Sequence, residues 1–484
     1  MAKTPVQHVF KIVPESLSDI TTDWCEKALQ KNSTISNETQ VTKVEVKQIN
    51  NEETGDSDGG GFSGSMLKKL ILSYGGIVTG NEPSSMVCKI SANIKRDLTF
   101  FFRGIGYLID GGNVDDEINR SEVMFYEKVA PLLKETQFQM PKSYFIGIED
   151  GGKSGFYHYV IQNKVSKIKS VLILEDMSSW KSLPACVCLT SQQMIASLKN
   201  IAVLHGKLWG NKEIFDIFGA SKSERDNRSY RYNRMAAFKR KRYCSNSNSF
   251  KKFSDKILSS EWPENIMMKL PKNVDKPDWL TIEPLEDGSY VVMKDPMVIE
   301  MLSTLENRMP NYFQKKLKPF SKIEPQTILH GDFHSGNQMY GTGNDEGKIT
   351  AIDFQIVGSG IVVFEVLSLV LFSWRIHNYD ELKDFAKEYH NTLVENGIND
   401  YSWAEFQDHL EMATVEFALN LMDIQASMKP KTFSDWMRKF AGKEKAEGML
   451  KIFETGIFNG GIIILTSLYA KDKENFLSIH EDGK

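Results

Sequence analysis

The sequence predicts an α+β protein in which a sheet-rich first part is followed by a mainly helical second part. Up to about residue 176, short segments such as residues 42–49 and 84–92 alternate apolar and polar residues, which is typical of strands with one buried face. From Thr190 onward, apolar residues recur mainly at helical spacing. We therefore expect two regions, residues 1–176 and residues 177–484.

The elements follow in order along the chain. Residues 42–49, 67–76 and 84–92 read as strands, and the second ends in a glycine turn. One helix is expected among them, over residues 115–133, because its apolar residues fall on one face. The helical region opens at Thr190, which forms a capping-box pattern with Gln193.

Composition narrows the class of protein. The 484 residues carry a formal net charge of −4, which gives no reason to expect a nucleic-acid partner. The five cysteines are odd in number and show no C-x-x-C spacing, so we expect a reduced compartment and no zinc site. The chain does not open like a signal peptide, and its longest apolar run, residues 361–374, is short and contains Glu365. These features predict a cytoplasmic protein without a membrane span.

The stretch 328–340, ILHGDFHSGNQMY, places polar residues directly behind an apolar run. It reads as a buried strand, a loop and a returning strand, and a turn then leads to the strand that ends at Asp353. We expect Asp332, Asn337 and Asp353 to meet at one rim, where two carboxylates and an amide oxygen suit Mg²⁺ bound to phosphates. The pattern from His330 to Asn337, followed by Asp353, resembles the catalytic and metal-binding segments of the kinase fold.

That resemblance requires three upstream features. Lys89 lies on a strand with Val87 on the same face, so Val87 would cover an adenine while Lys89 reaches the phosphates. Glu122 lies on the apolar face of the expected helix, where a carboxylate is costly unless it is paired, and Lys89 is its natural partner. A glycine-rich turn between two strands would hold phosphates, and its candidate residues are Gly61, Ser63 and Gly64.

Each feature alone has a simpler explanation. Lys89 fits an exposed strand lysine, Glu122 a carboxylate at a helix start, and the glycine run a plain turn. His205, in an apolar stripe, fits a core histidine. The basic residues 222–256 fit a solvated helix and surface loop, and their function stays open. The joint order of the motifs favours a two-lobed, protein-kinase-like fold, with residues 1–176 as the N-lobe and 177–484 as the helical C-lobe.

Little chain separates Asp353 from the apolar helix that contains Glu365. This leaves no room for the segment on which protein kinases dock peptides, so we expect a small-molecule substrate. From about residue 40 to 430 the sequence resembles the CHK kinase-like, or ecdysteroid-kinase-like, proteins of the aminoglycoside phosphotransferase and choline kinase superfamily. The segments that carry this resemblance are FSGSMLKKL, VCKI, SEVMFYEKVAP, VLILEDM, IAVLHGKLWG, HGDFHSGNQMY and AIDFQIVGSG.

The resemblance implies transfer of the ATP γ-phosphate, with Mg²⁺, to a hydroxyl of a small metabolite. It implies that Asp332 is the catalytic base and that His330 braces its loop. It also implies that Asn337 and Asp353 hold the metal. Lys89 would contact the ATP phosphates and be oriented by Glu122. The main chain of Glu175 and Asp176 would contact the adenine. One departure concerns Glu365-Val366, where the family usually has Asp-Leu.

Two other classes of function stay open. A pseudokinase would bind nucleotide without turnover, and it is disfavoured because Lys89, Asp332, Asn337 and Asp353 are all present. A nucleic-acid adaptor would use the basic residues 222–256 and would bind with a steep salt dependence. The sequence does not identify the phosphate acceptor, because a fold does not name a substrate.

Overall fold

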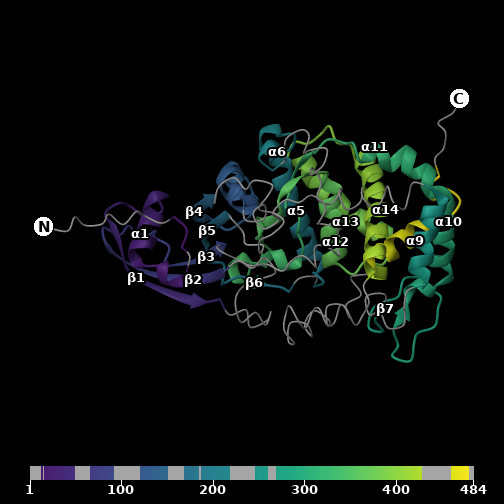
Figure 1. The fold of residues 1–484 in the computed structure, drawn as a ribbon, viewed down its shortest axis with the longest axis horizontal. Coiled ribbons are helices and arrows are strands. Elements are labelled where there is room, and N and C mark those ends of the chain that lie inside the picture. Colours follow the sequence, from purple (N-terminus) through teal and green to yellow (C-terminus); the bar gives the residue numbers. More distant parts are fainter. Residues whose placement is uncertain are drawn as a thin grey trace, which may run out of the picture.

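The computed structural model describes most of the chain, namely residues 12–14, 16–49, 66–91, 120–150, 168–184, 187–218, 246–259, 269–427 and 459–478. Figure 1 shows the strands of the N-terminal region gathered at one end of the molecule and the helices of the C-terminal region at the other. This arrangement confirms the predicted α+β fold class, with a sheet-rich region that precedes a helical one.

A five-stranded antiparallel sheet forms the N-terminal region, with strand order β1-β2-β3-β5-β4. Its strands are β1 (Thr39–Gln48), β2 (Met66–Gly76), β3 (Ser85–Ser91), β4 (Ser143–Asp150) and β5 (Ile168–Glu175). The three strands predicted before residue 93 correspond to β1, β2 and β3. The short η1 (Leu17–Asp19) and helix α1 (Thr22–Lys31) precede the sheet, and Trp24 of α1 packs edge-on against Phe145 of β4.

A helical segment follows β3 in the sequence and carries the predicted glutamate. Its described part is helical from residue 120, widens into a π-type turn, η2 (Phe125–Val129), and ends as α4 (Ala130–Leu133). Wide turns of this kind occur frequently at functional sites. The part of the predicted helix before residue 120 lies outside the described residues.

Helices form most of the C-terminal region. The longer ones are α5 (Ser191–Lys207), α6 (Lys212–Phe218), α9 (Ser247–Ser259), α10 (Pro296–Tyr312), α12 (Val362–Ser373), α13 (Tyr379–Glu395), α14 (Trp403–Ser427) and α16 (Gly460–Lys471). The predicted capping box at the start of α5 is confirmed, since Thr190 and Gln193 each accept the other's main-chain N–H. Of the basic tract 222–256, only the part from residue 246 is described, and it contains most of α9.

Short strands and turns connect these helices. The strands are β6 (Lys181–Ser182), β7 (Lys269–Leu270), β8 (Tyr290–Val291), β9 (Thr327–Leu329), β10 (Gln338–Tyr340), β11 (Ile349–Ala351) and β12 (Gly358–Gly360). The short helical turns are η6 (Val292–Lys294), η7 (Phe313–Leu317), α11 (Lys318–Phe320), η8 (Ser335–Asn337), η9 (Gly343–Asp345) and η10 (Phe354–Ile356). The predicted hairpin is present as β10 paired with β11, and β9 pairs with β12. These pairs hold the chain before and after the stretch 330–337 in fixed register.

Two clusters of buried apolar residues stabilise the described part of the chain. The smaller one lies between α1 and the N-terminal sheet, and the larger one runs through the helical region. The larger cluster also includes Phe125 and Val129, which precede β4 in the sequence. Burial of apolar surface therefore joins the helix that carries Glu122 to the C-terminal region.

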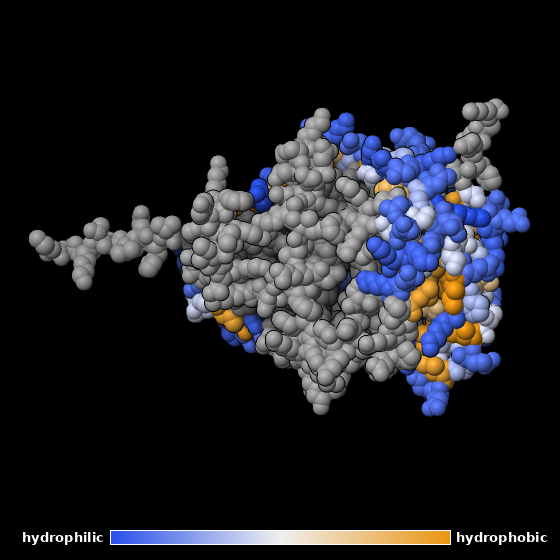
Figure 2. Space-filling model, turned by 45° about the vertical axis from the view of Figure 1, so that its right-hand side comes forward, coloured by the Kyte–Doolittle hydropathy of each residue, from blue (hydrophilic) through white to orange (hydrophobic). Residues whose placement is uncertain are grey.

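The described helices show no segment that is both long and apolar enough to cross a bilayer. On the face drawn in Figure 2, hydrophilic residues cover most of the described helical surface, and a few hydrophobic residues lie between them. His205 is fully buried, as predicted for a core histidine, and its Nδ1 lies 2.6 Å from the hydroxyl of Tyr389.

Candidate active site

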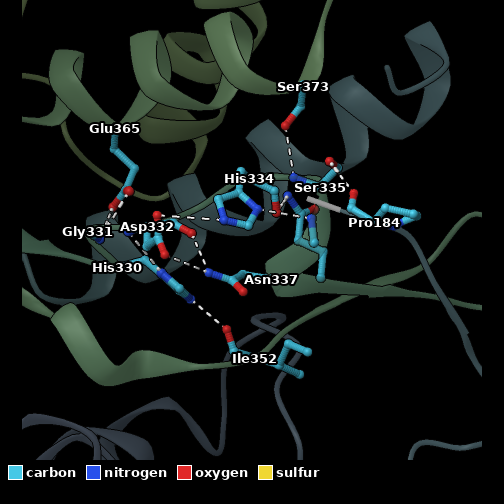
Figure 3. A network of polar contacts seen from close by, with 12 residues as sticks. Pro184, His330, Gly331, Asp332, His334, Ser335, Asn337, Ile352, Glu365 and Ser373 are labelled. Carbon is cyan, nitrogen blue, oxygen red and sulfur yellow. Dashed lines mark hydrogen bonds and ion pairs between the residues drawn. The ribbon is translucent and has the colours of Figure 1, made fainter. Parts of the chain in front are cut away.

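Asp332 and Asn337 meet within the loop that joins β9 to β10 (Figure 3). The Asn337 side-chain N–H donates to the Asp332 carboxylate Oδ2 at 3.1 Å and to its main-chain oxygen at 2.8 Å. The Asp332 side chain is 46% exposed. The loop therefore holds this carboxylate in one orientation while part of it stays open to solvent.

His330 is fully buried beneath the same loop. Its Nε2 donates to the main-chain oxygen of Ile352 at 2.8 Å, and its Nδ1 faces the main-chain N–H of Asp332 at 3.4 Å. The ring also packs against Phe354, with centroids 4.8 Å apart. His330 thus connects the Asp332 loop to the residues on either side of Asp353.

Gly331 and Glu365 fix the start of the loop. The Gly331 N–H donates to both carboxylate oxygens of the fully buried Glu365, at 3.1 and 3.3 Å. Gly331 has φ +86°, and a Cβ there would lie 2.2 Å from the oxygen of Ile356, so only glycine fits this position. Glu365 of α12 therefore contacts the loop despite being one methylene longer than the aspartate expected from the resemblance.

Lys89 of β3 contacts two carboxylates that come from distant parts of the sequence. Its Nζ lies 2.8 Å from Glu122 Oε2 and 2.7 Å from Asp353 Oδ1. The Lys89 side chain is 11% exposed and the Glu122 side chain 6%. Gln355, two residues after Asp353, also hydrogen-bonds to Glu122. The structure therefore brings together the predicted pair and adds Asp353 to it.

The two carboxylates that share Lys89 have pKa values shifted in opposite directions. Burial alone would lower the pKa of Lys89, but Asp353 and Glu122 outweigh burial and raise it. Burial raises the pKa of Glu122 more than Lys89 lowers it. Burial is the largest single influence on Asp353 and would raise its pKa, but Lys89, His330 and His334 together outweigh burial and lower the pKa. Lys89 therefore stays cationic and Asp353 anionic, as a site for phosphate and metal requires.

Asp353 has an unusual main-chain conformation. Its φ of +66° and ψ of +61° are left-handed, which is uncommon for residues other than glycine. Strained residues of this kind cluster at functional sites. The next residue, Phe354, stacks on Phe125 with ring centroids 3.7 Å apart. This stack fixes the Asp353 turn against the helical segment that carries Glu122.

The predicted adenine contacts lie on β3 and at the end of β5, two interior strands of the N-terminal sheet. Val87 pairs with Leu174 of β5, and Met86 pairs with Glu175. The Glu175 carboxylate accepts the main-chain N–H of Lys142 at 3.1 Å. The predicted phosphate-binding turn, with Gly61, Ser63 and Gly64, lies outside the described residues.

His334 also belongs to this site, although its role was not predicted from the sequence. Its Nδ1 accepts the N–H of Gly336 at 3.0 Å, and its Nε2 lies 3.7 Å from Asp332 Oδ1 (Figure 3). In the neutral ring the proton therefore sits on Nε2 and faces the carboxylate. The one signal in the sequence was the H-x-D-x-H spacing, which places both histidines two residues from Asp332.

The oxygens at this rim suit a hard cation. Asn337 donates its amide hydrogens to Asp332, and its main-chain oxygen accepts the N–H of Ile352, the residue before Asp353. Its side-chain oxygen takes no part in the contact with Asp332, so this oxygen and the Asp353 carboxylate are the candidate metal ligands. Among the described residues, no three His, Cys, Asp or Glu side chains converge as a metal cage. Mg²⁺ needs no such cage, because it binds through one or two protein carboxylates, phosphates and water.

Comparison with known proteins gives both distant structural similarity and a family match. One similar solved structure is a Ralstonia eutropha protein assigned as an aminoglycoside phosphotransferase. The two sequences are 12% identical, the match covers 92% of this chain and 98% of the other, and the TM-score is 0.41. A microcompartment-associated aminopropanol kinase shows 10% identity, coverage of 95% and 100%, and a TM-score of 0.39. A Plasmodium vivax ethanolamine kinase shows 10% identity, coverage of 94% and 93%, and a TM-score of 0.35. No curated protein matches the chain.

The family model extends over residues 114–398, more than half of the chain. It includes Glu122, the Asp332 loop, Asp353 and Glu365, whereas Lys89 and the glycine-rich turn precede it. The matched range is shorter than the residues 40–430 expected from the quoted motifs. The chain belongs to the ecdysteroid kinase-like family.

Proposed function

We propose that the protein is an ATP-dependent kinase that transfers the γ-phosphate to a hydroxyl group of a small molecule. The observation that carries this proposal is the pair of contacts made by Lys89, at 2.8 Å from Glu122 and 2.7 Å from Asp353. A structural lysine needs only one buried partner. A lysine shared between a helix and the strand-final aspartate suits a phosphate contact that must keep its charge and position.

Each residue then has a positional or electrostatic role. Lys89 would bind the ATP phosphates, and Glu122 would orient Lys89. Asn337 and Asp353 would hold Mg²⁺, which supplies positive charge to the triphosphate. His330 and Glu365 would fix the Asp332 loop through their main-chain contacts.

Asp332 would accept the proton of the attacking hydroxyl. Its carboxylate is partly exposed and held by Asn337, so a bound hydroxyl could reach it without displacing a buried partner. The hydroxyl oxygen forms a bond to the γ-phosphorus while the bond from phosphorus to the ADP oxygen breaks. The products are a phosphate monoester and ADP, and the proton resides on Asp332 until solvent takes it.

The course of the chain after Asp353 favours a small acceptor over a protein. Immediately after η10, β12 pairs with β9, and α12 already begins at Val362. All residues of this connection are described, and none forms a long surface segment on which a peptide would dock. The reaction class is therefore proposed as phosphorylation of a metabolite alcohol, which includes sterol-like, aminoglycoside-like and choline-like acceptors.

The test is a screen of small alcohols, amino alcohols and sterols with Mg²⁺ and ATP, in which ADP release and the phosphorylated product are both measured. We expect turnover with at least one acceptor and its loss in Lys89→Met. The matched control is Lys47→Met, which breaks an exposed ion pair of the same sheet. Binding of Mg·ATP without turnover on any acceptor would instead support a nucleotide-binding protein without kinase activity.

A further inference from the structure

The Asp176 carboxylate lies at the centre of a polar cluster at the end of β5. Lys69 Nζ lies 2.6 Å from its Oδ2, and the Ser85 hydroxyl donates to the same oxygen at 2.7 Å. The main-chain N–H of Ser178 donates to Oδ1 at 3.0 Å. Lys69 also donates to the Ser178 hydroxyl at 2.8 Å. Both carboxylate oxygens thus have protein partners.

This cluster joins three strands at one place. Lys69 of β2 pairs with Val87 of β3, which pairs with Leu174 of β5. Directly opposite residues in a sheet share a face, so Lys69 and Val87 lie on the same side. The cluster therefore connects β2 and β3 to the chain that leaves β5 toward the helical region.

The contacts of Asp176 are charge-assisted and mostly buried. The Asp176 side chain is only 7% exposed, and charge-assisted hydrogen bonds are about twice as strong as neutral ones. Burial would raise the pKa of Asp176, but the hydrogen bonds from Lys69, Ser85 and Ser178 outweigh it and lower the pKa to about 2. The carboxylate therefore stays charged near neutral pH.

Lys69, Ser85 and Ser178 contact both oxygens of the Asp176 carboxylate, and the side chain is buried, so little of it is accessible to a nucleotide. The same contacts hold the main chain at residues 175–178, next to the face of the sheet on which Val87 lies. A main chain that is fixed before a ligand arrives does not have to be ordered on binding, which increases affinity.

We propose that Lys69 and Asp176 are a positioning pair for the nucleobase, which holds the main chain after β5 in the conformation that binds adenine. This inference rests on the proposed ATP-dependent function. It assigns a role in nucleotide binding to Lys69, which lies outside the range matched by the family model. It also predicts that the pair affects binding of the base and not binding of the phosphates.

The experiment compares two probes by titration calorimetry, Mg·ATP and inorganic Mg·tripolyphosphate, which has the phosphates without the base. The variants are Lys69→Met and Asp176→Asn, and Lys69→Arg should keep the cation and the affinity. We expect the Kd for Mg·ATP to rise about tenfold if the competent conformation falls to about a tenth of the population. The Kd for tripolyphosphate should stay within about twofold, since Lys89 and Asp353 are unchanged.

The controls separate this inference from the proposed function. Lys47→Met should bind both probes like the parental protein, and the Lys69→Met, Asp176→Asn double variant should be no weaker than either single variant. If Lys69→Met does not fold, Ser85→Ala removes one hydrogen bond from Asp176 and serves as the test. Equal weakening of both probes, or no weakening of Mg·ATP, overturns the positioning role. Absence of Mg·ATP binding by the parental protein overturns the proposed function instead.

Discussion

At the scale of single residues, the proposed base is held from several directions. Asn337 contacts Asp332 Oδ2, and His334 Nε2 faces Oδ1 at 3.7 Å. The main-chain N–H of Asp332 points to His330, and its main-chain oxygen accepts Asn337 and His334. Such preorganisation lets a carboxylate receive a proton without reorganising during the reaction.

Replacement of Asp332 by asparagine should separate chemistry from binding. Asp332→Asn keeps the shape of the side chain but removes the charge that accepts the proton. We expect turnover to fall by about two to four orders of magnitude, while the Kd for Mg·ATP moves little because Asn337 and Asp353 remain. Turnover is measured as ADP release with the acceptor from the screen, and binding by calorimetry. A variant that turns over at the parental rate would exclude Asp332 as the base.

Glu365 offers a second prediction at this scale. Glu365→Ala leaves the buried Gly331 N–H without its acceptor, which should cost about 1–3 kcal/mol of unfolding free energy. Glu365→Gln keeps an acceptor oxygen at the same distance and should cost less. Glu365→Asp, which introduces the aspartate expected from the resemblance, withdraws the carboxylate and should lower turnover. Chemical denaturation gives the unfolding free energies, and a loss in Glu365→Gln equal to that in Glu365→Ala would contradict the contact.

The sequence predicted those residues whose chemistry is unusual for their surroundings. Glu122 lies on an apolar helix face, and Asp332, Asn337 and Asp353 lie next to buried strands, so their partners could be inferred. His334 and the Asp176 cluster were missed because their roles depend on ring orientation and on the register of β2 against β3. Register is set by the whole sheet and cannot be read from one strand.

At the scale of elements, the helices of the described residues contain three buried histidines. His205 of α5 faces Glu365 and His330, and His409 of α14 faces Asp408 and the Tyr401 hydroxyl. His390 of α13 contacts the main-chain oxygen of Tyr401. Burial is the main cause that lowers the pKa of each histidine, so all three are neutral in the folded protein near neutral pH.

These histidines predict an acid-sensitive fold. Once the pH falls below about 6.5, the ordinary histidine pKa, the unfolded chain binds protons that the folded protein excludes. Stability should therefore decrease from about pH 6.5 down to the lowered pKa values and change little above that range. Thermal unfolding between pH 5 and 8 measures this, and His409→Gln should flatten the profile more than His377→Gln in the loop before α13. An acid-independent melting temperature would rule out neutral buried histidines.

Short-range signals predicted the elements that depend on neighbouring residues, such as the capping box at Thr190 and the β10–β11 hairpin. The wide turn at Phe125–Val129 was not predicted, because the apolar spacing across it remains helical. Its first residue, Phe125, stacks on Phe354 from a distant part of the chain. Local propensity carries no information about such a contact.

At the scale of the whole molecule, the site depends on contacts between the N-terminal sheet and the helical region. Asp353→Ala should weaken Mg·ATP binding by about tenfold or more, since it removes a carboxylate from the metal and leaves triphosphate charge uncompensated. Asn307→Ala, at an exposed position of α10, is a control that should leave binding unchanged. Calorimetry at fixed Mg²⁺ measures both, and equal affinities would contradict the metal role of Asp353.

Lys89 and Glu122 should also show energetic coupling. Lys89→Met should lower turnover more than Glu122→Gln, because the lysine contacts phosphate and the glutamate only orients it. The double variant should be about as impaired as Lys89→Met alone, since the second change has no remaining partner to disturb. Strictly additive losses in turnover would mean that the two residues act independently.

The stack of Phe125 on Phe354 also determines how the chain could be divided. Phe125 belongs to the first 176 residues and Phe354 to the remainder, yet both are fully buried in one cluster. A chain cut at this boundary would give two fragments, each with an exposed aromatic face that only the other can cover. Such fragments would serve poorly as separate proteins but well as halves of a complementation reporter, in which reassembly restores Lys89, Glu122 and Asp353 at the same moment.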